Sequence, residues 1–427
     1  MERLIGKIKK RFFYGWVIVA LAMVCMAFWY AFRTVFAVFF VALIDHFHWS
    51  RAEAAGAQSI GMLVYMITAP VVGYLVDRVG PRKVMFPEIF LMGLGLLLCT
   101  QINSLLQFYI YFGVVAGTGV TFLSISPLTT ILSHWFEKKR GLANGLASVG
   151  IGFGPLLFVP LIQYLINLRG WPFAFFIFSL LVFFVSPPLI GLFLRRRPED
   201  MGLSIDGNPQ SFPSQTVYFR KGNQGQRVRD LIKTLRFWLF LLFPALAIFG
   251  VYIIIVHHVR YLVDLGVDRI WAASLFAAMG AMSAGFRFLW GWFSDRVGRE
   301  ITYTLGGICF ALGILSLILF QTFPSVLFLY LFAFFFGGGW GSTAPMFMSI
   351  AGDLYKGRRF GLIYGMLEGM IGVGAAIGSW LGGYLFDQTQ SYLLAFSIAI
   401  VYCIISIFLV WYVGPQKGLS SSSASNF

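Results

Sequence analysis

Charged side chains are scarce in this sequence, and their scarcity limits the kind of protein it can be. Only 11% of the 427 residues are Asp, Glu, Lys or Arg, whereas 59% are hydrophobic and 18% are aromatic. A soluble domain carries about 25% charged residues. One soluble core could not hide this much apolar surface, and the same composition excludes an intrinsically disordered chain. We therefore expect lipid to be the solvent for most of the surface.

Cysteine and histidine are also rare, with four and five copies. The cysteines all lie in apolar runs and form neither a CxxC motif nor a Cys/His cluster: Cys25, Cys99, Cys309 and Cys403. Such a pattern excludes a disulfide framework and a zinc site. No Ser/His/Asp set, phosphate-binding loop or cofactor motif is present either. We therefore expect no enzyme activity, no metal and no cofactor other than a proton gradient.

Long hydrophobic runs are what the sequence has in quantity. A membrane-crossing helix needs about 20 mostly apolar residues, and twelve segments qualify. The candidate spans are 13–42, 56–79, 84–103, 107–134, 142–168, 172–194, 236–260, 272–294, 302–322, 325–352, 360–386 and 391–414. Strand-like alternation is absent, and lipid forbids unpaired backbone. The sequence therefore predicts an all-α membrane protein with twelve transmembrane helices, the first of which is a span and not a cleaved signal peptide.

The polar stretch 195–235 divides the spans into six and six. It is rich in Pro, Gly, Ser, Asn and Gln, which is typical of a linker. We expect a six-helix bundle over 1–194, a cytoplasmic linker over 195–235 and a second six-helix bundle over 236–416. The small polar residues of 417–427 predict a disordered cytoplasmic tail.

Acidic residues are outnumbered, 17 against 32 basic ones, which gives a net charge of +15. In a soluble protein this excess would indicate nucleic acid. Here 26 of the 32 basic residues fall on the side of the spans that holds both termini, and four fall on the other. Basic residues collect on the cytoplasmic side of membrane proteins. We therefore expect both termini in the cytoplasm and the basic excess against anionic lipid, with no nucleic-acid partner.

The two groups of spans share repeated motifs. GYLVDRVGPRK at 73–83 matches GWFSDRVGRE at 291–300, and RGLANGLASVGIGFG at 140–154 matches FGLIYGMLEGMIGVG at 360–374. The offsets between the copies are nearly equal and the matches follow one order, so the chain is interpreted as a duplicated six-helix unit. Two parallel repeats related by an axis along the membrane normal are typical of many secondary transporters.

The motif at 73–83 resembles the signature G-x-L-x-D-R-x-G-x-R-K of the major facilitator superfamily, and the likeness extends over essentially the whole chain. The resemblance implies two pseudo-symmetric six-helix bundles around a central cavity bounded by spans 1, 4, 5, 7, 8, 10 and 11. It also implies a cytoplasmic conformational latch, with a short helix–helix turn carrying basic anchors as the alternative. The latch residues would be Gly73, Asp77, Arg78, Gly80, Arg82, Asp295 and Arg296.

Three ionisable residues lie well inside spans: Arg33, Arg287 and Glu368. Placing each of these side chains in lipid costs at least about 2.5–3.5 kcal/mol of free energy, so each is expected to have a structural or functional role. Arg287 and Glu368 lie at a similar depth, about 12 Å from the inner ends of spans eight and eleven. A pair or a ligand is therefore expected. We hypothesise that Arg287 binds a substrate carboxylate bidentately, with Glu368 as its competitor and proton carrier; the alternative is an inert buried salt bridge.

Arg33 is placed by the same count about 30 Å from the inner end, in the outer third of span one. Together with His257 and the adjoining His258 it predicts a cationic outer vestibule that attracts anions, with a snorkelling Arg as the alternative. His257 is a second candidate for proton coupling. Trp340 and Tyr364 are candidates to line the substrate path.

A second level of resemblance is to the monocarboxylate and oxalate:formate branch of the superfamily, especially its bacterial members. The sequences YAFRTVFAVFF at 30–40, RRRPEDMGL at 195–203 and the HxVxYLxDLG pattern at 257–266 carry it. Arg287 matches the substrate arginine of this branch. Ser283 stands where monocarboxylate transporters have Asp, and Glu368 stands where oxalate:formate antiporters have a second basic residue. One buried Arg balances one carboxylate, which favours a monoanion over a dianion.

The resemblance thus predicts alternating-access symport of a small monocarboxylate, such as lactate, pyruvate or acetate, with one proton, by a functional monomer in the cell inner or plasma membrane. The first alternative is an organic-anion antiporter of the oxalate:formate type. A second is a drug or metabolite efflux antiporter, because GIGFGP at 150–155 partly resembles the antiporter signature of span five. A receptor with this fold would need a larger cytoplasmic domain than the linker offers.

Overall fold

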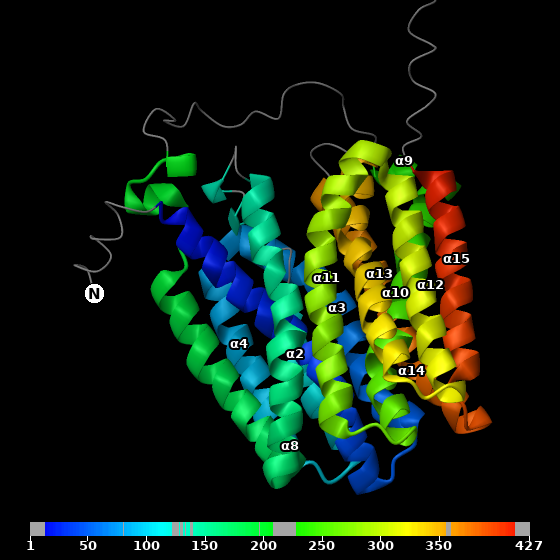
Figure 1. Ribbon diagram of the computed structural model, residues 1–427. Coiled ribbons are helices and arrows are strands. Elements are labelled where there is room, and N and C mark those ends of the chain that lie inside the picture. Colours follow the sequence, from blue (N-terminus) through cyan, green and yellow to red (C-terminus); the bar gives the residue numbers. More distant parts are fainter. Residues whose placement is uncertain are drawn as a thin grey trace, which may run out of the picture.

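The computed structural model describes residues 13–79, 81–121, 128, 131–132, 134–136, 140–195, 197–207, 228–355 and 360–414. Within these ranges the chain is helical and contains no strand. This agrees with the all-α membrane protein predicted from the apolar runs. Figure 1 shows the helices lying side by side along one common direction.

The described residues of the first half form four helices long enough to name as spans and, between the third and the fourth, a segment of mixed helix types. These elements are α2 (Gly15–Phe47), α3 (Arg51–Val79), α4 (Pro81–Leu98) with the 3-10 turn η1 (Cys99–Gln101), then α5 (Leu105–Phe108), the π-helix η2 (Tyr109–Ala116), α6 (Gly117–Thr121) and α8 (Arg140–Phe193). They cover the predicted spans one to six, although the later part of span four lies largely outside the described residues.

The helix α8 contains two predicted spans, 142–168 and 172–194, and the structure breaks it between them. Arg169 and Gly170 have non-helical dihedrals, and Gly170 has φ +83°. Glycine adopts a positive φ without the steric cost that a Cβ imposes. Gly170 therefore makes the sharp reversal that separates the two spans contained in α8.

The second half contains six long helices, as predicted. They are α10 (Leu235–Asp264), α11 (Arg269–Val297), α12 (Arg299–Thr322), α13 (Val326–Leu354), α14 (Phe360–Thr389) and α15 (Leu393–Val413). Between the halves lie the short elements η3 (Pro198–Met201), η4 (Ile205–Gly207) and α9 (Val228–Leu231).

Length and composition qualify eight helices among the described residues to cross a membrane, α8 being counted once despite its break. Two shorter apolar helices, Ile89–Gln101 and Leu105–Thr121, accompany them. Large apolar side chains such as Phe184, Phe288 and Phe408 are 70–77% exposed. An exposed apolar surface of this kind is expected of a protein whose outer solvent is lipid.

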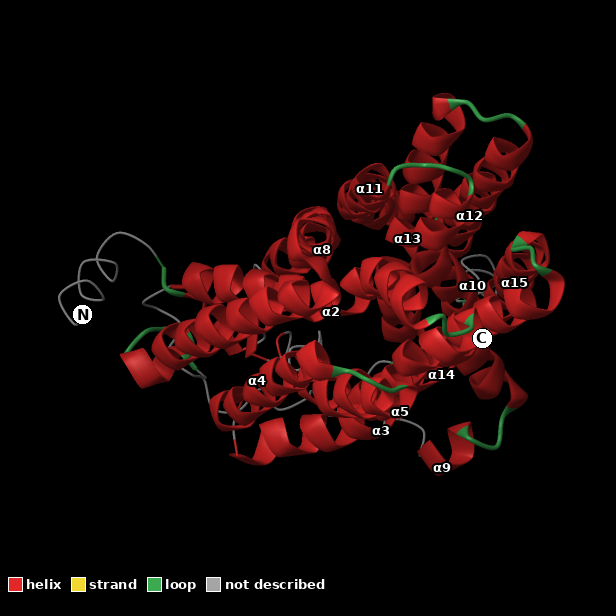
Figure 2. Cartoon of the chain, turned by 90° about the horizontal axis from the view of Figure 1, so that it is seen from below, coloured by secondary structure: helices red, strands yellow, loops and turns green. Residues whose placement is uncertain are grey.

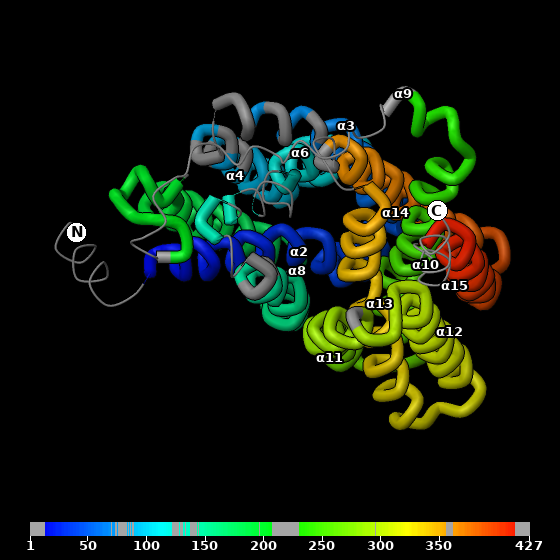
Figure 3. Tube along the Cα trace, turned by 90° about the horizontal axis from the view of Figure 1, so that it is seen from above, coloured from blue at the N-terminus to red at the C-terminus, as the bar shows by residue number. Residues whose placement is uncertain are grey.

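Among the described helices, the main contacts between the two halves are those of α3 with α14, α8 with α11, and α2 with α10. The first two pairs lie side by side in Figures 2 and 3. The contact of α8 with α11 depends on Gly152, because a Cβ at this position would come within 2.4 Å of the Ala284 Cβ. Small residues allow such close approach of membrane helices. These three pairs enclose the space in which the candidate site lies.

Candidate functional site

A polar cavity lies between the two halves, near the middle of the long helices. Its volume is about 80 Å³, whereas an engineered apolar cavity of about 150 Å³ accepts benzene. The lining residues are Trp29, Tyr30, Arg33, Met62, Tyr65, Ile151, Ile248, Tyr252, Arg287, Trp340, Thr343, Ala344, Phe347, Tyr364, Glu368, Ile371, Gly372 and Ala375. They come from spans 1, 2, 5, 7, 8, 10 and 11, so span two joins those that the resemblance implied, and none of the described residues of span four is in the lining.

The guanidinium group of Arg33 is held by aromatic rings. Its Cζ lies 4.5 Å from the centre of the Trp29 ring and 4.3 Å from that of Tyr65. Its Nη1 donates a long hydrogen bond of 3.4 Å to the Tyr252 hydroxyl. The residue is only 6% exposed, and its Nε and Nη2 are buried without a partner. Aromatic faces stabilise the cation but leave two donors available to a ligand.

Arg33 does not lie in an outer vestibule, so that prediction is wrong. The helix α2 runs from Gly15 to Phe47, which is longer than the predicted span of 13–42. Arg33 therefore lies just past the middle of the helix, at the level of Arg287 and Glu368. The cavity therefore contains two arginines, where one was predicted from the sequence.

Arg287 reaches the cavity from α11. Its Cζ lies 5.9 Å from the centre of the Trp340 ring, and its Nε is buried without a partner. Among the residues that the structure describes, no carboxylate lies within ion-pair distance of it. A buried cation without a counter-ion is costly, so the geometry leaves Arg287 available to an anionic ligand.

Glu368, on α14, does not pair with Arg287. Its Oε2 accepts a hydrogen bond of 2.8 Å from the hydroxyl of Tyr65 on α3. Tyr364, one turn earlier on α14, also hydrogen-bonds this carboxyl group, and Arg33 is the cation that acts on it electrostatically. The predicted salt bridge between Glu368 and Arg287 is thus replaced by an arrangement in which Tyr65 lies between Glu368 and Arg33.

Tyr364 and Trp340 line the cavity where the sequence placed them. The aromatic rings of Trp29, Tyr65 and Tyr252 were missed. Nothing in the sequence separates these three from the many other aromatic residues, because their role depends on contacts between helices far apart in the chain.

A network of ion pairs joins the halves at one end of the molecule, which we call the outer end in keeping with the predicted orientation. Arg51 at the start of α3 contacts Asp264 at the end of α10, with 2.5 Å between Nη2 and Oδ2. Asp45 of α2 binds both Arg260 and Arg269, the latter at 2.6 Å. Each pair links the first half to the second.

Asp387 of α14 strengthens this outer contact by capping a helix of the other half. Its two carboxylate oxygens accept the backbone N–H groups of Arg51 and Ala52 at 3.0 and 2.8 Å. A carboxylate at a helix N-terminus satisfies free donors and opposes the helix dipole. Gly383, one turn earlier, permits the approach, since a Cβ there would lie 2.6 Å from the Arg51 backbone.

His257, predicted to couple protons, lies off the cavity and within this outer region. Its Nε2 is 2.8 Å from the Ser379 carbonyl oxygen, which can only accept, so Nε2 carries the proton and Nδ1 accepts from the Tyr392 hydroxyl at 3.3 Å. Burial raises the pKa of Tyr392, which connects α14 to α15 and keeps its proton. Both ring nitrogens of His257 therefore take part in hydrogen bonds, and His257 is not among the described residues that line the cavity.

Comparison with known proteins identifies the family. The family model of the Major Facilitator Superfamily matches residues 17–355 and 261–426. The chain belongs to the Major Facilitator Superfamily. Curated relatives include monocarboxylate transporter 2 of Homo sapiens, 27% identical over 89% of this chain and 81% of the relative, and monocarboxylate transporter 13 of Rattus norvegicus, 29% identical over 90% of this chain and 86% of the relative.

Solved structures of the superfamily share the fold. A bacterial homologue of the human lysosomal transporter Spinster, inward-facing and unoccupied, has a TM-score of 0.73 at 15% identity and covers 94% of this chain and 97% of its own. A D-xylose–proton symporter has a TM-score of 0.71 at 16% identity, covering 94% and 98%. The protein is thus a multi-pass membrane transporter of small molecules with the twelve-helix fold of this superfamily.

The superfamily motif itself falls where the structure gives little detail. The side chains of Asp77, Arg78, Arg82 and Asp295 and the surroundings of Gly73 are outside what the structure describes, and Gly80 lies outside the described residues. Arg296 is described and exposed, with its Cζ 3.8 Å from the centre of the Trp292 ring. The cytoplasmic latch therefore stays a prediction.

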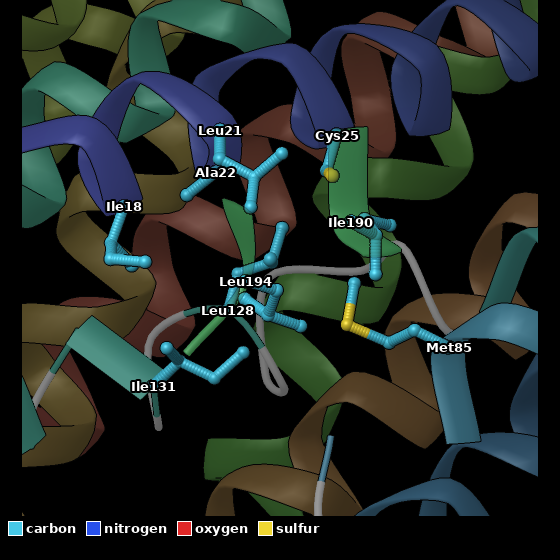
Figure 4. A pocket seen from close by; sticks show the side chains of 9 residues that line it. All are labelled: Ile18, Leu21, Ala22, Cys25, Met85, Leu128, Ile131, Ile190 and Leu194. Atoms are coloured by element: carbon cyan, nitrogen blue, oxygen red, sulfur yellow. The ribbon is translucent and has the colours of Figure 1, made fainter. Parts of the chain in front are cut away.

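A second, apolar void lies within the first half, away from the polar cavity. It is lined by Ile18, Leu21, Ala22, Cys25, Met85, Leu128, Ile131, Ile190 and Leu194, as Figure 4 shows. It leaves no volume for a water molecule and presents no polar surface. It is therefore a packing gap between helices, and the polar cavity between the halves is the candidate transport site.

Proposed function

We propose that this transporter moves a small monocarboxylate together with one proton, by alternating access of the central cavity to the two sides of the membrane. The observation that carries the proposal is the unpaired Arg287 in a cavity that also holds Glu368 and Arg33. A guanidinium group binds a carboxylate through two parallel hydrogen bonds. The partnerless Nε of Arg287 supports this mode of binding.

The charges of the cavity support a one-to-one stoichiometry. With Glu368 ionised, the two arginines and one carboxylate leave a net charge of +1. When Glu368 takes up a proton and a substrate carboxylate enters, the substrate replaces the charge of Glu368 and the net charge stays at +1. Because empty and loaded sites carry the same charge, each can be occluded in lipid at a similar electrostatic cost. Symport would then be electroneutral.

The size and walls of the cavity favour a short, partly apolar acid. A volume near 80 Å³ accommodates a few heavy atoms, and the rings of Trp29, Tyr30 and Trp340 form an apolar wall beside the cations. Lactate, pyruvate and acetate combine one carboxylate with a small apolar remainder. The relatives named as monocarboxylate transporters favour the same class.

The proposed cycle begins with the outer ion pairs broken and the cavity open to the outside. Once Glu368 has taken up its proton, binding of the carboxylate at Arg287 favours the state in which the outer contacts close. Substrate and proton can drive this change only by binding one state better than the other. We further propose a cell inner or plasma membrane location, both termini in the cytoplasm and a functional monomer.

Uptake by proteoliposomes tests the proposal. Vesicles that contain the purified protein and are placed in an acidic medium should accumulate labelled lactate above its external concentration. A protonophore should abolish this accumulation. Arg287→Lys keeps the charge but removes the bidentate geometry, and it should reduce uptake by at least about tenfold, the effect of 1.4 kcal/mol. Normal accumulation by this variant would contradict the role given to Arg287.

A second candidate function is exchange of organic anions, and the presence of two arginines in one cavity favours it. Two cations could bind the two carboxylates of a dianion. Vesicles preloaded with oxalate would then take up labelled formate or oxalate without a proton gradient. Exchange of this kind, with no gradient-driven accumulation of lactate, would replace symport by antiport.

A further inference from the structure

Tyr65 joins two oppositely charged groups and two halves of the molecule at one point. Its ring covers the Arg33 guanidinium group at 4.3 Å, and its hydroxyl donates to Glu368 Oε2 at 2.8 Å. Arg33 and Tyr65 belong to the first half, on α2 and α3, whereas Glu368 belongs to the second, on α14. Tyr65 is only 3% exposed, so water competes little for this hydrogen bond.

The contact lies on the same helix pair as the outer closure. Along α3 and α14, Asp387 caps the backbone at Arg51, and the Ser59 hydroxyl donates to the Ala376 carbonyl at 2.7 Å. The bond between Tyr65 and Glu368 is the next polar contact inward along this pair. A change in its strength therefore acts on the surface where the two halves separate.

We propose that Tyr65 couples the protonation of Glu368 to the separation of the two halves. This inference rests on the proposed function, in which Glu368 carries the proton. Tyr65 acts through Glu368 and is thus a positioning residue. A hydrogen bond to an ionised carboxylate is roughly twice as strong as one to a neutral group. When a proton from water converts the Glu368 carboxylate into a carboxyl group, the link between α3 and α14 weakens, and no other bond forms or breaks.

The groups around Glu368 make this effect specific. Tyr65 faces it from α3, Tyr364 from its own helix α14, and Arg33 acts on it from α2. The other titratable side chains in the described wall are Tyr30, Tyr252 and Arg287. Among the residues that the structure describes, no His or Asp, and no second Glu, lines the cavity. Tyr364 hydrogen-bonds the same carboxyl group without crossing between halves, so it provides a matched control.

The test compares Tyr65→Phe with Tyr364→Phe. Each variant removes one hydroxyl that stabilises the ionised carboxylate, and Tyr65→Phe keeps the ring that covers Arg33. Both should move the midpoint of the pH profile of uptake to higher pH by about one to two units, since a hydrogen bond to a charged group contributes about 1.5–3 kcal/mol. Damage to the fold would lower the uptake rate without moving the pH midpoint, so a shift shared by both variants indicates loss of a hydrogen bond.

The distance between the halves distinguishes the two variants. Spin labels at exposed positions of the outer end, Leu106 in the first half and Phe323 in the second, report the separation in the full-length protein with its four cysteines replaced. Acidification should raise the separated population about fivefold in the wild type and in Tyr364→Phe, the effect of roughly 1 kcal/mol. In Tyr65→Phe the population should change less than about twofold. An unchanged pH response in Tyr65→Phe, or equal loss in Tyr364→Phe, would overturn the proposal.

Glu368→Gln keeps the inference testable even if Tyr65→Phe does not fold. This variant is always neutral, so the distance should match that of the acidified wild type at every pH, and a persisting pH response would refute the coupling. The same variant separates the two proposals. Proton-driven accumulation by Glu368→Gln would overturn the proposed function itself. Loss of accumulation, together with a wild-type distance response in Tyr65→Phe, would overturn only the role of Tyr65.

Discussion

Replacing Asp387 with Ala should open the outer end of the transporter. Asp387 accepts the first two N–H groups of α3 across the interface between the halves, at 3.0 and 2.8 Å. Losing a helix cap costs about 0.5–2 kcal/mol, and losing a charge at the helix dipole adds about 0.3–1 kcal/mol. The cap exists only while the outer end is closed. The variant should therefore lower the closed population relative to the open one by roughly 5-fold to 150-fold, the range for 1–3 kcal/mol.

Thiol labelling from outside the cell measures this population. Ala375 lines the cavity and is 1% exposed, so a cysteine introduced there reacts with a membrane-impermeant reagent only when the outer end opens. The labelling rate should rise by the same factor as the open population in Asp387→Ala.

A matched control lies elsewhere in the chain. Asp268 caps α11 by accepting the Trp271 N–H at 3.0 Å, within its own half. Asp268→Ala loses a similar cap but breaks no contact between halves, so its labelling rate should stay near that of the parent. Equal rates in the two variants would refute the reasoning that Asp387 holds the outer end closed.

Two further predictions concern the cavity and the helix contact beside it. Glu368→Gln should keep exchange of labelled for unlabelled lactate but lose gradient-driven accumulation, because the side chain binds no exchangeable proton; accumulation at the wild-type level would contradict the proton-carrier role. Gly383→Ala should slow uptake by at least about tenfold, because the new Cβ would lie 2.6 Å from the Arg51 backbone, whereas Gly365→Ala on the same helix, with no atom within 4 Å, should transport normally. Comparable uptake rates for the two glycine variants would show that close approach at Gly383 is not required.

Much of the fold was predictable because lipid imposes strong rules on sequence. Apolar runs predicted the spans, and the helices α10 to α15 follow them closely. The break at Arg169 and Gly170 falls between the two predicted spans, 142–168 and 172–194. Helix ends were harder to predict, because α2 continues past the predicted residue 42 to Phe47. That error misplaced Arg33, whose depth was counted from one end only.

The candidate site was predictable only for residues that lipid makes conspicuous. Arg287 and Glu368 stand out because a charge within a span is costly, and both line the cavity. Their partners were not predictable. Glu368 accepts a hydrogen bond from Tyr65, 303 residues away in sequence, and Arg51 donates one to Asp264, 213 residues away. Such contacts depend on how the two halves pack, and periodicity within one helix carries no information about that packing.

The central claim is that a substrate carboxylate takes over the charge of Glu368 when that residue binds a proton. Its most direct test counts protons and lactate together, with a pH-sensitive dye trapped in proteoliposomes and labelled lactate outside, at several membrane voltages. The account predicts one proton taken up for each lactate, at a rate that does not depend on voltage. A ratio clearly different from one, or uptake that changes with voltage, would contradict it.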